Sequence, residues 1–221
     1  MNEVFISKPV MWAPGLEDDP EKWEKWLKGK DSIEKSSSAP KLEYTDPLFR
    51  RRLSQISKMT VHVVHALLEK CSFDKDTKLV FVSFRGEIAR EFSINKGIIN
   101  EKMILPAGFS LSVFNTPVAL ATIAFGLTGG YSAVYPSKGD LSSALKTALA
   151  PVLCGEEKKI VLVYADELVP ECYGVESTPL AFAAVVSSEE MPDSVKIGDF
   201  DSEKTPEGFL KRLLEAGKSD V

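Results

Sequence analysis

The sequence predicts an α/β fold in which a mostly parallel, five-stranded mixed sheet has helices on both faces. Two observations support this prediction. Apolar segments of strand length alternate along the chain with longer segments whose apolar residues recur at helical spacing, and this alternation is typical of a sheet flanked by helices. The strand candidates are also apolar almost without interruption, which indicates that both of their faces are buried.

Five segments are predicted to be strands. They are short and rich in Val, Ile, Phe and Ala, the composition expected of buried strands. They cover residues 4–7, 78–84, 131–135, 159–165 and 179–187.

Helix starts are marked by a capping side chain followed by proline, the residue favoured at the first helical position. This pair occurs at Asp19-Pro20, Asp46-Pro47 and Thr205-Pro206. Apolar residues at helical spacing form one stripe between Leu53 and Leu68 and another between Leu141 and Val152. The second of these segments, residues 139–153, and one further segment, residues 115–125, are apolar nearly all round, as expected of helices buried on two sides.

A change in composition divides the chain near residue 188. Residues 1–187 carry the alternating strands and helices, so we expect them to form one domain. Residues 188–221 begin with an acidic, proline-containing stretch and end with the helix that starts at Thr205-Pro206. We expect an acidic linker and a C-terminal helix in this second part.

The composition excludes several classes of protein. Hydrophobic residues make up 44% and charged residues 27% of the chain, and no apolar run approaches the ~18 residues of a membrane span. A net charge of −5 argues against binding to nucleic acid. The N-terminus lacks a secretory signal, and three widely spaced cysteines give neither a disulfide framework nor a zinc site. We therefore expect a cytoplasmic protein without a membrane span.

Six short motifs follow one another along the chain. They are Arg51–Lys58, Val82–Glu87, Ile104-Leu105-Pro106, Asn115-Thr116-Pro117, Gly126-Leu127-Thr128-Gly129 and the turn Pro136–Asp140. In this order they resemble the β-ketoacyl synthase N-terminal-domain family, which has the fold of half a thiolase. This short branch is often encoded beside aryl polyene and fatty-acid-type synthase genes. The resemblance covers roughly residues 3–187.

The nucleophilic cysteine of the resembled enzymes is absent from this turn. Counting without gaps from Gly126 places Lys138 at its position, and a slip of one residue places Ser137 there. A protonated lysine cannot take an acyl group as a thiolate does. The resemblance therefore implies that Pro136, Ser137 and Lys138 form a nucleophile-equivalent turn with no catalytic residue.

The same resemblance suggests residues that contact a substrate. They are Asn115, Ser137, Lys138 and Asp166. Asp166 and Glu167 follow an apolar strand, where α/β sheets place ligand contacts, although anchoring of a loop is the more common role for such residues. Ser137 is further expected to cap the helix that begins near Gly139.

The only two histidines do not supply the missing chemistry. The resembled enzymes carry a histidine pair for decarboxylation in their second half, whereas His62 and His65 lie on a predicted helix in the first. No cysteine or carboxylate stands beside them at metal-ligand spacing, so we expect ordinary helix-surface histidines and no metal. Gly126 and Gly129-Gly130 are followed by no Lys-Ser/Thr signature, so no phosphate cradle and no cofactor are expected.

The sequence therefore favours a non-condensing, ketosynthase-like subunit in carrier-protein-dependent fatty acid or polyketide synthesis of the aryl polyene type. Such a subunit would shape an acyl site or stabilise an active partner. The expected partners are a second copy or a full-length ketosynthase, with an acyl carrier protein as a further candidate. Two alternatives stay open. One is an acyltransferase or thioesterase-like enzyme that uses Ser137, and the other is a structural protein that has kept only the fold.

Overall fold

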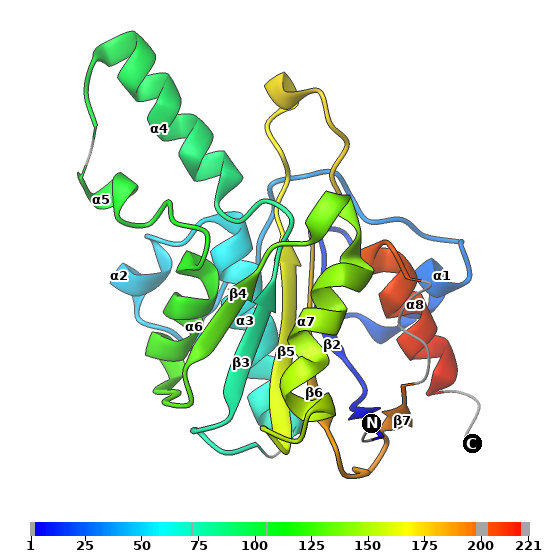
Figure 1. The fold of residues 1–221 in the computed structure, drawn as a ribbon. Coiled ribbons are helices and arrows are strands. Elements are labelled where there is room, and N and C mark those ends of the chain that lie inside the picture. The colour runs from blue at the N-terminus through cyan, green and yellow to red at the C-terminus, as the bar shows by residue number, and fades with distance from the viewer. Residues whose placement is uncertain (1–2, 72, 105, 198–202, 218–221) are drawn as a thin grey trace.

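A mixed β-sheet runs through the centre of the molecule and carries helices on both faces (Figure 1). The computed structural model describes residues 3–71, 73–104, 106–197 and 203–217. Within these residues the sheet has seven strands in the order β4-β3-β5-β6-β1-β7, and β2 also pairs with β6. The strands are β1 (Phe5–Ile6), β2 (Val10–Trp12), β3 (Lys78–Val82), β4 (Tyr131–Val134), β5 (Lys159–Asp166), β6 (Leu180–Ser187) and β7 (Val195–Lys196).

The predicted α/β fold with a mixed sheet is confirmed, and the five predicted strands are all present. Two short strands, β2 and β7, were not predicted, because two or three residues show no periodicity. Strand β3 pairs in parallel with β4 and β5, while the remaining pairs are antiparallel. Strands β5 and β6 are antiparallel neighbours. Their connection, residues 167–179, contains no α-helix that could carry the chain back across the sheet, as a parallel pair would require.

Side chains of the central strands alternate between two apolar layers. On β3, Leu79 and Phe81 face one layer and Val80 and Val82 face the other. Helices α3 (Gln55–Lys70) and α6 (Thr116–Phe125) cover the first layer. Helices α1 (Pro20–Leu27), α7 (Leu141–Leu153) and α8 (Pro206–Ala216) cover the second. The predicted burial of both faces is confirmed for β3, β5 and β6.

The three predicted capping pairs are confirmed. Asp19 accepts hydrogen bonds from the backbone of Glu21 and Lys22 at the start of α1, and Thr205 accepts one from Gly208 at the start of α8. Asp46 caps α2 (Pro47–Arg50), a single helical turn. The long helix α3 begins at Gln55, because Ser54 accepts the N–H of Ser57. Arg51 and Arg52 lie in a turn before it.

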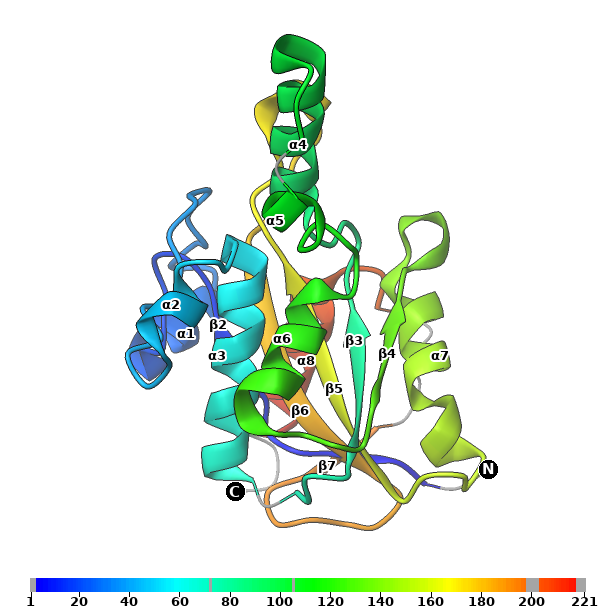
Figure 2. The same cartoon turned by 90° about the vertical axis from the view of Figure 1, so that its left-hand side faces the viewer.

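Helix α4 (Ile88–Glu101) projects away from the body of the molecule beyond the carboxyl ends of β3 and β5 (Figures 1 and 2). It is followed by the short helix α5 (Pro106–Phe109), and neither helix contains a buried residue. The 3₁₀ turn η2 (Glu171–Tyr173) lies beside α4, where the ring of Tyr173 contacts Phe92. No helix among the described residues has both the length and the apolar character needed to cross a membrane.

Two expectations of burial were wrong. Strand β4 was expected to be buried, but Tyr131, Ser132 and Ala133 are exposed because β4 is the edge of the sheet. Helix α7 was expected to be apolar nearly all round, but its outward residues include exposed Lys146 and Thr147. The inward face of α7 is buried against the sheet, and α8 supplies Phe209, Leu210 and Leu213 to the same layer.

Candidate functional site

The turn expected to correspond to the nucleophile follows the edge strand β4. Residues Ser137–Gly139 form the 3₁₀ turn η1, in which Lys138 has a left-handed backbone with φ of 57°. Pro136 is buried, whereas Ser137 and Lys138 are exposed. The turn is held to α7 by the Ser137 N–H, which donates to Ser143 Oγ (2.9 Å).

Ser137 was expected to cap α7, and this expectation was wrong. Asp140 is the capping residue, because its carboxylate accepts the N–H of Ser142 (2.9 Å). Hydrogen bonding from the Ser142 side chain, followed by that from its backbone, lowers the pKa of Asp140. The left-handed residues Lys138 and Gly139 separate Ser137 from the helix, so its hydroxyl is too early in the chain to reach the free N–H groups.

The chemistry available to the turn follows from its exposure. A lysine side chain in water is a cation at neutral pH, and a cationic amine has no free electron pair with which to attack a thioester. Lys138 is exposed to water. Among the described residues no side chain forms a hydrogen bond with Ser137 Oγ, so no general base activates this hydroxyl. Acyl transfer to Ser137 stays a prediction.

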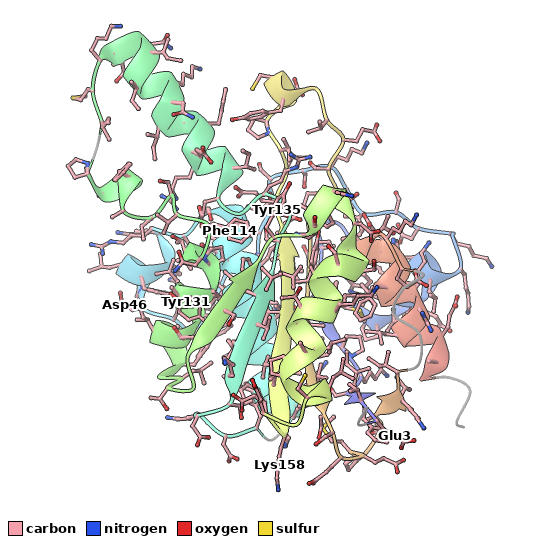
Figure 3. The ribbon with its side chains drawn as sticks, in the orientation of Figure 1. Glu3, Asp46, Phe114, Tyr131, Tyr135 and Lys158 are labelled. Atoms are coloured by element: carbon pink, nitrogen blue, oxygen red, sulfur yellow. The ribbon has the colours of Figure 1, made fainter. Side chains whose placement is uncertain are left out.

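The residues suggested for substrate binding do not all lie at one place in the structure. Asn115 Nδ2 donates to Tyr131 Oη (2.8 Å) and so ties the start of α6 to the start of β4. Ser137 and Lys138 follow the other end of β4. Figure 3 labels Tyr131 and Tyr135 on this edge, near Phe114. Substrate contact by Asn115, Ser137 and Lys138 also stays a prediction.

The carboxylate of Asp166 is hydrogen-bonded to other groups of the same chain. Its carboxylate accepts hydrogen bonds from Ser83 Oγ (2.7 Å), Tyr164 Oη (2.6 Å) and the backbone N–H groups of Phe84 and Arg85 (3.0 and 3.1 Å). Burial raises the pKa of Asp166, and these hydrogen bonds oppose that effect. Asp166 therefore anchors the turn between β3 and α4, which is the loop-anchoring role predicted as the more common one.

A second buried carboxylate lies where α3, α4 and β5 meet. Glu167 follows β5 and accepts the backbone N–H groups of Ala89 (2.9 Å) and Ile56 (3.3 Å), which belong to the first turns of α4 and α3. Glu167 is 1% exposed. Burial, together with the nearby charge of Glu87, raises the pKa of Glu167 to about 7.

Glu87 completes this junction from the start of α4. Its carboxylate accepts hydrogen bonds from Ser54 Oγ (2.7 Å), Ser57 Oγ and Arg90 Nε (2.9 Å). Sequence reasoning recognised Glu87 only as part of a motif, because its partners on α3 are about thirty residues away along the chain. The apolar strand that ends in two carboxylates, Asp166-Glu167, was the signal that pointed to this place.

A groove of about 560 Å³ lies beside this junction, between α2 and α5. Its charged residues are Arg51, Arg52 and Arg90, and its apolar residues include Leu53 and Leu111. Arg90 is engaged by Glu87 and by the carbonyl of Arg52. The groove thus combines cationic side chains with an apolar floor, which suits an anionic, amphipathic group.

The family model described as "Beta-ketoacyl synthase, N-terminal domain" matches residues 23–207. The chain belongs to this family. A comparison with curated proteins finds no match. The resemblance inferred from the motifs is confirmed, and the thiolase-like fold is shared with solved ketosynthases.

Three solved structures are among those to which the ketosynthase-like chain is similar. A ketosynthase (ApeO) in complex with its chain length factor (ApeC) from Xenorhabdus doucetiae matches with a TM-score of 0.72 and 25% identity, covering 85% of this chain and 79% of that chain. The ishigamide ketosynthase/chain length factor matches with a TM-score of 0.64 and 12% identity, covering 84% and 62%. A type II polyketide synthase acyl-carrier protein in complex with its ketosynthase (AntDE:AntF) matches with a TM-score of 0.62 and 14% identity, covering 84% and 63%.

The three matches differ in the share of the matched chain that this chain covers. The chain spans less than two thirds of the second and third matched chains. In the first match the shares of the two chains are nearly equal, so that chain is close to this one in length. The family match and the first of these neighbours make the chain a ketosynthase-like protein.

Proposed function

We propose that this protein is a non-condensing, ketosynthase-like subunit that associates with an active ketosynthase in acyl-carrier-protein-dependent chain assembly of the aryl polyene type. The turn after β4 carries the proposal. Exposed Lys138, with its left-handed backbone, occupies the position where the resemblance expects a nucleophile. A turn without a nucleophile suits a subunit that shapes or stabilises the acyl site of another chain.

The partner is proposed to dock on the face formed by β4 and α6. One side of β4 pairs with β3, and its other side has no strand beside it in the described residues. Next to this free edge lie exposed apolar side chains, including Ile123 (72% exposed), Tyr135 (63%) and Val113 (50%). A free strand edge beside exposed apolar residues is a site for pairing with another chain.

An active ketosynthase is the occupant that we propose for this face. The X. doucetiae complex, whose matched chain is close to this one in length, joins a ketosynthase to its chain length factor. Association with a ketosynthase would also supply the nucleophile that the turn lacks.

The arginine-lined groove supports the proposal that an acyl carrier protein takes part. The prosthetic arm of a carrier protein has an anionic phosphodiester next to a less polar chain. Arg51 and Arg52 provide guanidinium groups that recognise phosphate geometry, and Leu53 and Leu111 provide apolar contact. This local positive charge stands out in a chain whose net charge is −5.

Co-purification tests the proposed partner surface. The chain and the full-length ketosynthase from the same genome are expressed together, and the complex is measured by light scattering after affinity purification of the ketosynthase. We expect Val113→Asp and Ile123→Asp to weaken the complex by at least roughly tenfold, because each places a charge in an apolar contact.

Val175→Asp is the matched control. Val175 is 43% exposed, close to the 50% of Val113, but it follows η2 rather than lying near β4. We expect this variant to bind the ketosynthase as the unchanged chain does. Equal loss of binding in all three variants, or no complex with the unchanged chain, would refute the proposed surface.

A further inference from the structure

The chain leaves the regular ladder between β1 and β2. Ile6 pairs with Val186 and Val10 pairs with Ala183, so three residues of one strand face two of the other. Pro9 has no N–H to donate, which prevents a regular ladder here. Ser7 closes the gap, because its Oγ accepts the N–H of Val185 (3.0 Å). The Ser7 backbone also stays on β6, because its N–H donates to the carbonyl of Val185 (2.9 Å). The result is a bulge at Lys8 and Pro9.

A groove of about 670 Å³ opens beside this bulge. Its floor includes the apolar residues Val10, Val185 and Trp23, each of which is at most 3% exposed. Two half-buried methionines, Met11 and Met191, flank the floor. The volume lies within the range of about 300–1,000 Å³ that is typical of small-molecule sites, and methionine side chains adapt readily to a flexible apolar ligand.

Three lysines line the same groove. Lys8 comes from the bulge, Lys70 from the last turn of α3 and Lys159 from the start of β5. In the described part of the chain, no carboxylate forms an ion pair with any of the three. Two aspartates also line the groove. Asp18 is hydrogen-bonded to His62 Nε2 (2.7 Å), and Asp193 is exposed on the loop after β6.

We propose that this groove binds an amphipathic monocarboxylate, of which a medium-chain fatty acid is the simplest case. The carboxylate would pair with the lysines, and the alkyl chain would lie on the apolar floor. Lysines act as point charges and set no planar geometry, so they suit a head group recognised by charge alone. The site is separate from the proposed partner surface and does not depend on it, because the groove is lined by no residue of β4 or α6.

Calorimetric titration of the full chain with decanoate, below the concentration at which it forms micelles, tests this proposal. We expect one saturable site. Decanol, which has the same chain without the charge, should bind roughly tenfold more weakly. Exchange of both groove lysines in Lys70→Gln/Lys159→Gln should weaken decanoate binding by roughly the same factor.

Lys158→Gln is the control for the change of charge. Lys158 adjoins Lys159 in sequence, but its side chain is 88% exposed and lies near Glu189. Figure 3 shows it just before the start of β5, pointing away from the body of the molecule. We expect this variant to bind decanoate with unchanged affinity.

Met191→Glu provides a second, independent test, because it places a negative charge beside the floor on a surface loop. Binding should then be lost while the circular dichroism spectrum is retained. Absence of saturable binding to the unchanged chain, equal affinity for decanoate and decanol, or equal affinity of the lysine variants and the Lys158→Gln control would each overturn the proposal.

Discussion

Single residues decide what the turn after β4 can do. Lys138 offers an exposed cation, and Ser137 offers a hydroxyl without a base among its described contacts. Stability in this turn depends instead on Asp140, which satisfies a free N–H at the start of α7. The two polar side chains therefore differ in their expected effect on stability.

Asp140→Ala is expected to lower the free energy of unfolding by more than Ser137→Ala does, because it removes the cap of α7. Ser137→Ala should change it by less than about 0.5 kcal/mol, since it removes an exposed hydroxyl. Urea unfolding of the two variants measures both effects. A larger loss for Ser137→Ala than for Asp140→Ala would contradict this assignment of the cap.

Glu167 is expected to make stability depend on pH. Its pKa in the folded chain is about 7, against an ordinary value of 4.5, so between these values the folded chain holds a proton that the unfolded chain has released. The free energy of unfolding therefore falls as pH rises through this interval, by on the order of 3 kcal/mol.

Urea unfolding at pH 5 and pH 8 of the unchanged chain and of Glu167→Gln measures this effect. The variant should lose less stability between the two pH values, because its amide does not titrate. Some loss will remain, since burial also raises the pKa of Asp166. The same pH dependence in both proteins would show that Glu167 does not titrate in this range.

At the scale of elements, α8 packs in the same apolar layer as α7, on one face of the sheet. Phe209 is 2% exposed, and its ring lies 5.9 Å from that of Phe182 on β6. The C-terminal helix is therefore part of the core of the chain.

Phe209→Ala is expected to destabilise the protein by about 3–5 kcal/mol, because it removes a buried aromatic side chain. Glu215→Ala, on the exposed face of the same helix, is the control and should change stability by less than about 0.5 kcal/mol. Thermal and urea unfolding provide the measurement. A Phe209→Ala variant as stable as the control would mean that α8 does not pack on the sheet.

The sequence predicted those elements whose signals are local. Asp19-Pro20 and Thr205-Pro206 mark helix starts because the cap and the N–H groups that it satisfies lie within three residues. In the segment from Ser137 to Asp140 two side chains could cap the helix, and the choice depended on the left-handed backbone of Lys138. That conformation cannot be read from residue types alone.

Contacts between distant segments could not be predicted in the same way. The exposure of β4 depends on its place at the edge of the sheet, which is set by the order of the strands. The junction of Glu87 and Glu167 depends on the meeting of three elements, although two carboxylates after an apolar strand pointed to it. Groups that meet only in the folded chain leave no periodic pattern in the sequence.

At the scale of the whole molecule, the two sides of the sheet differ in how they are covered. The side of α7 is closed by α1 and α8, while the β4 edge and the outer face of α6 leave Ile123, Tyr131 and Tyr135 exposed. Helix α4 adds a projection with no buried residue (Figure 2). These features favour association with another chain at the β4 edge.

The central claim is that the protein assists condensation without carrying it out. Elongation of an acyl group by the purified chain, supplied with acylated and malonylated carrier protein and analysed by intact-protein mass spectrometry, tests this claim most directly. We predict no elongated product and no acyl adduct, both for the unchanged chain and for Lys138→Cys, and elongated product once the partner ketosynthase is added. Elongated product from the purified chain alone, or an acyl adduct on Ser137, would contradict the account.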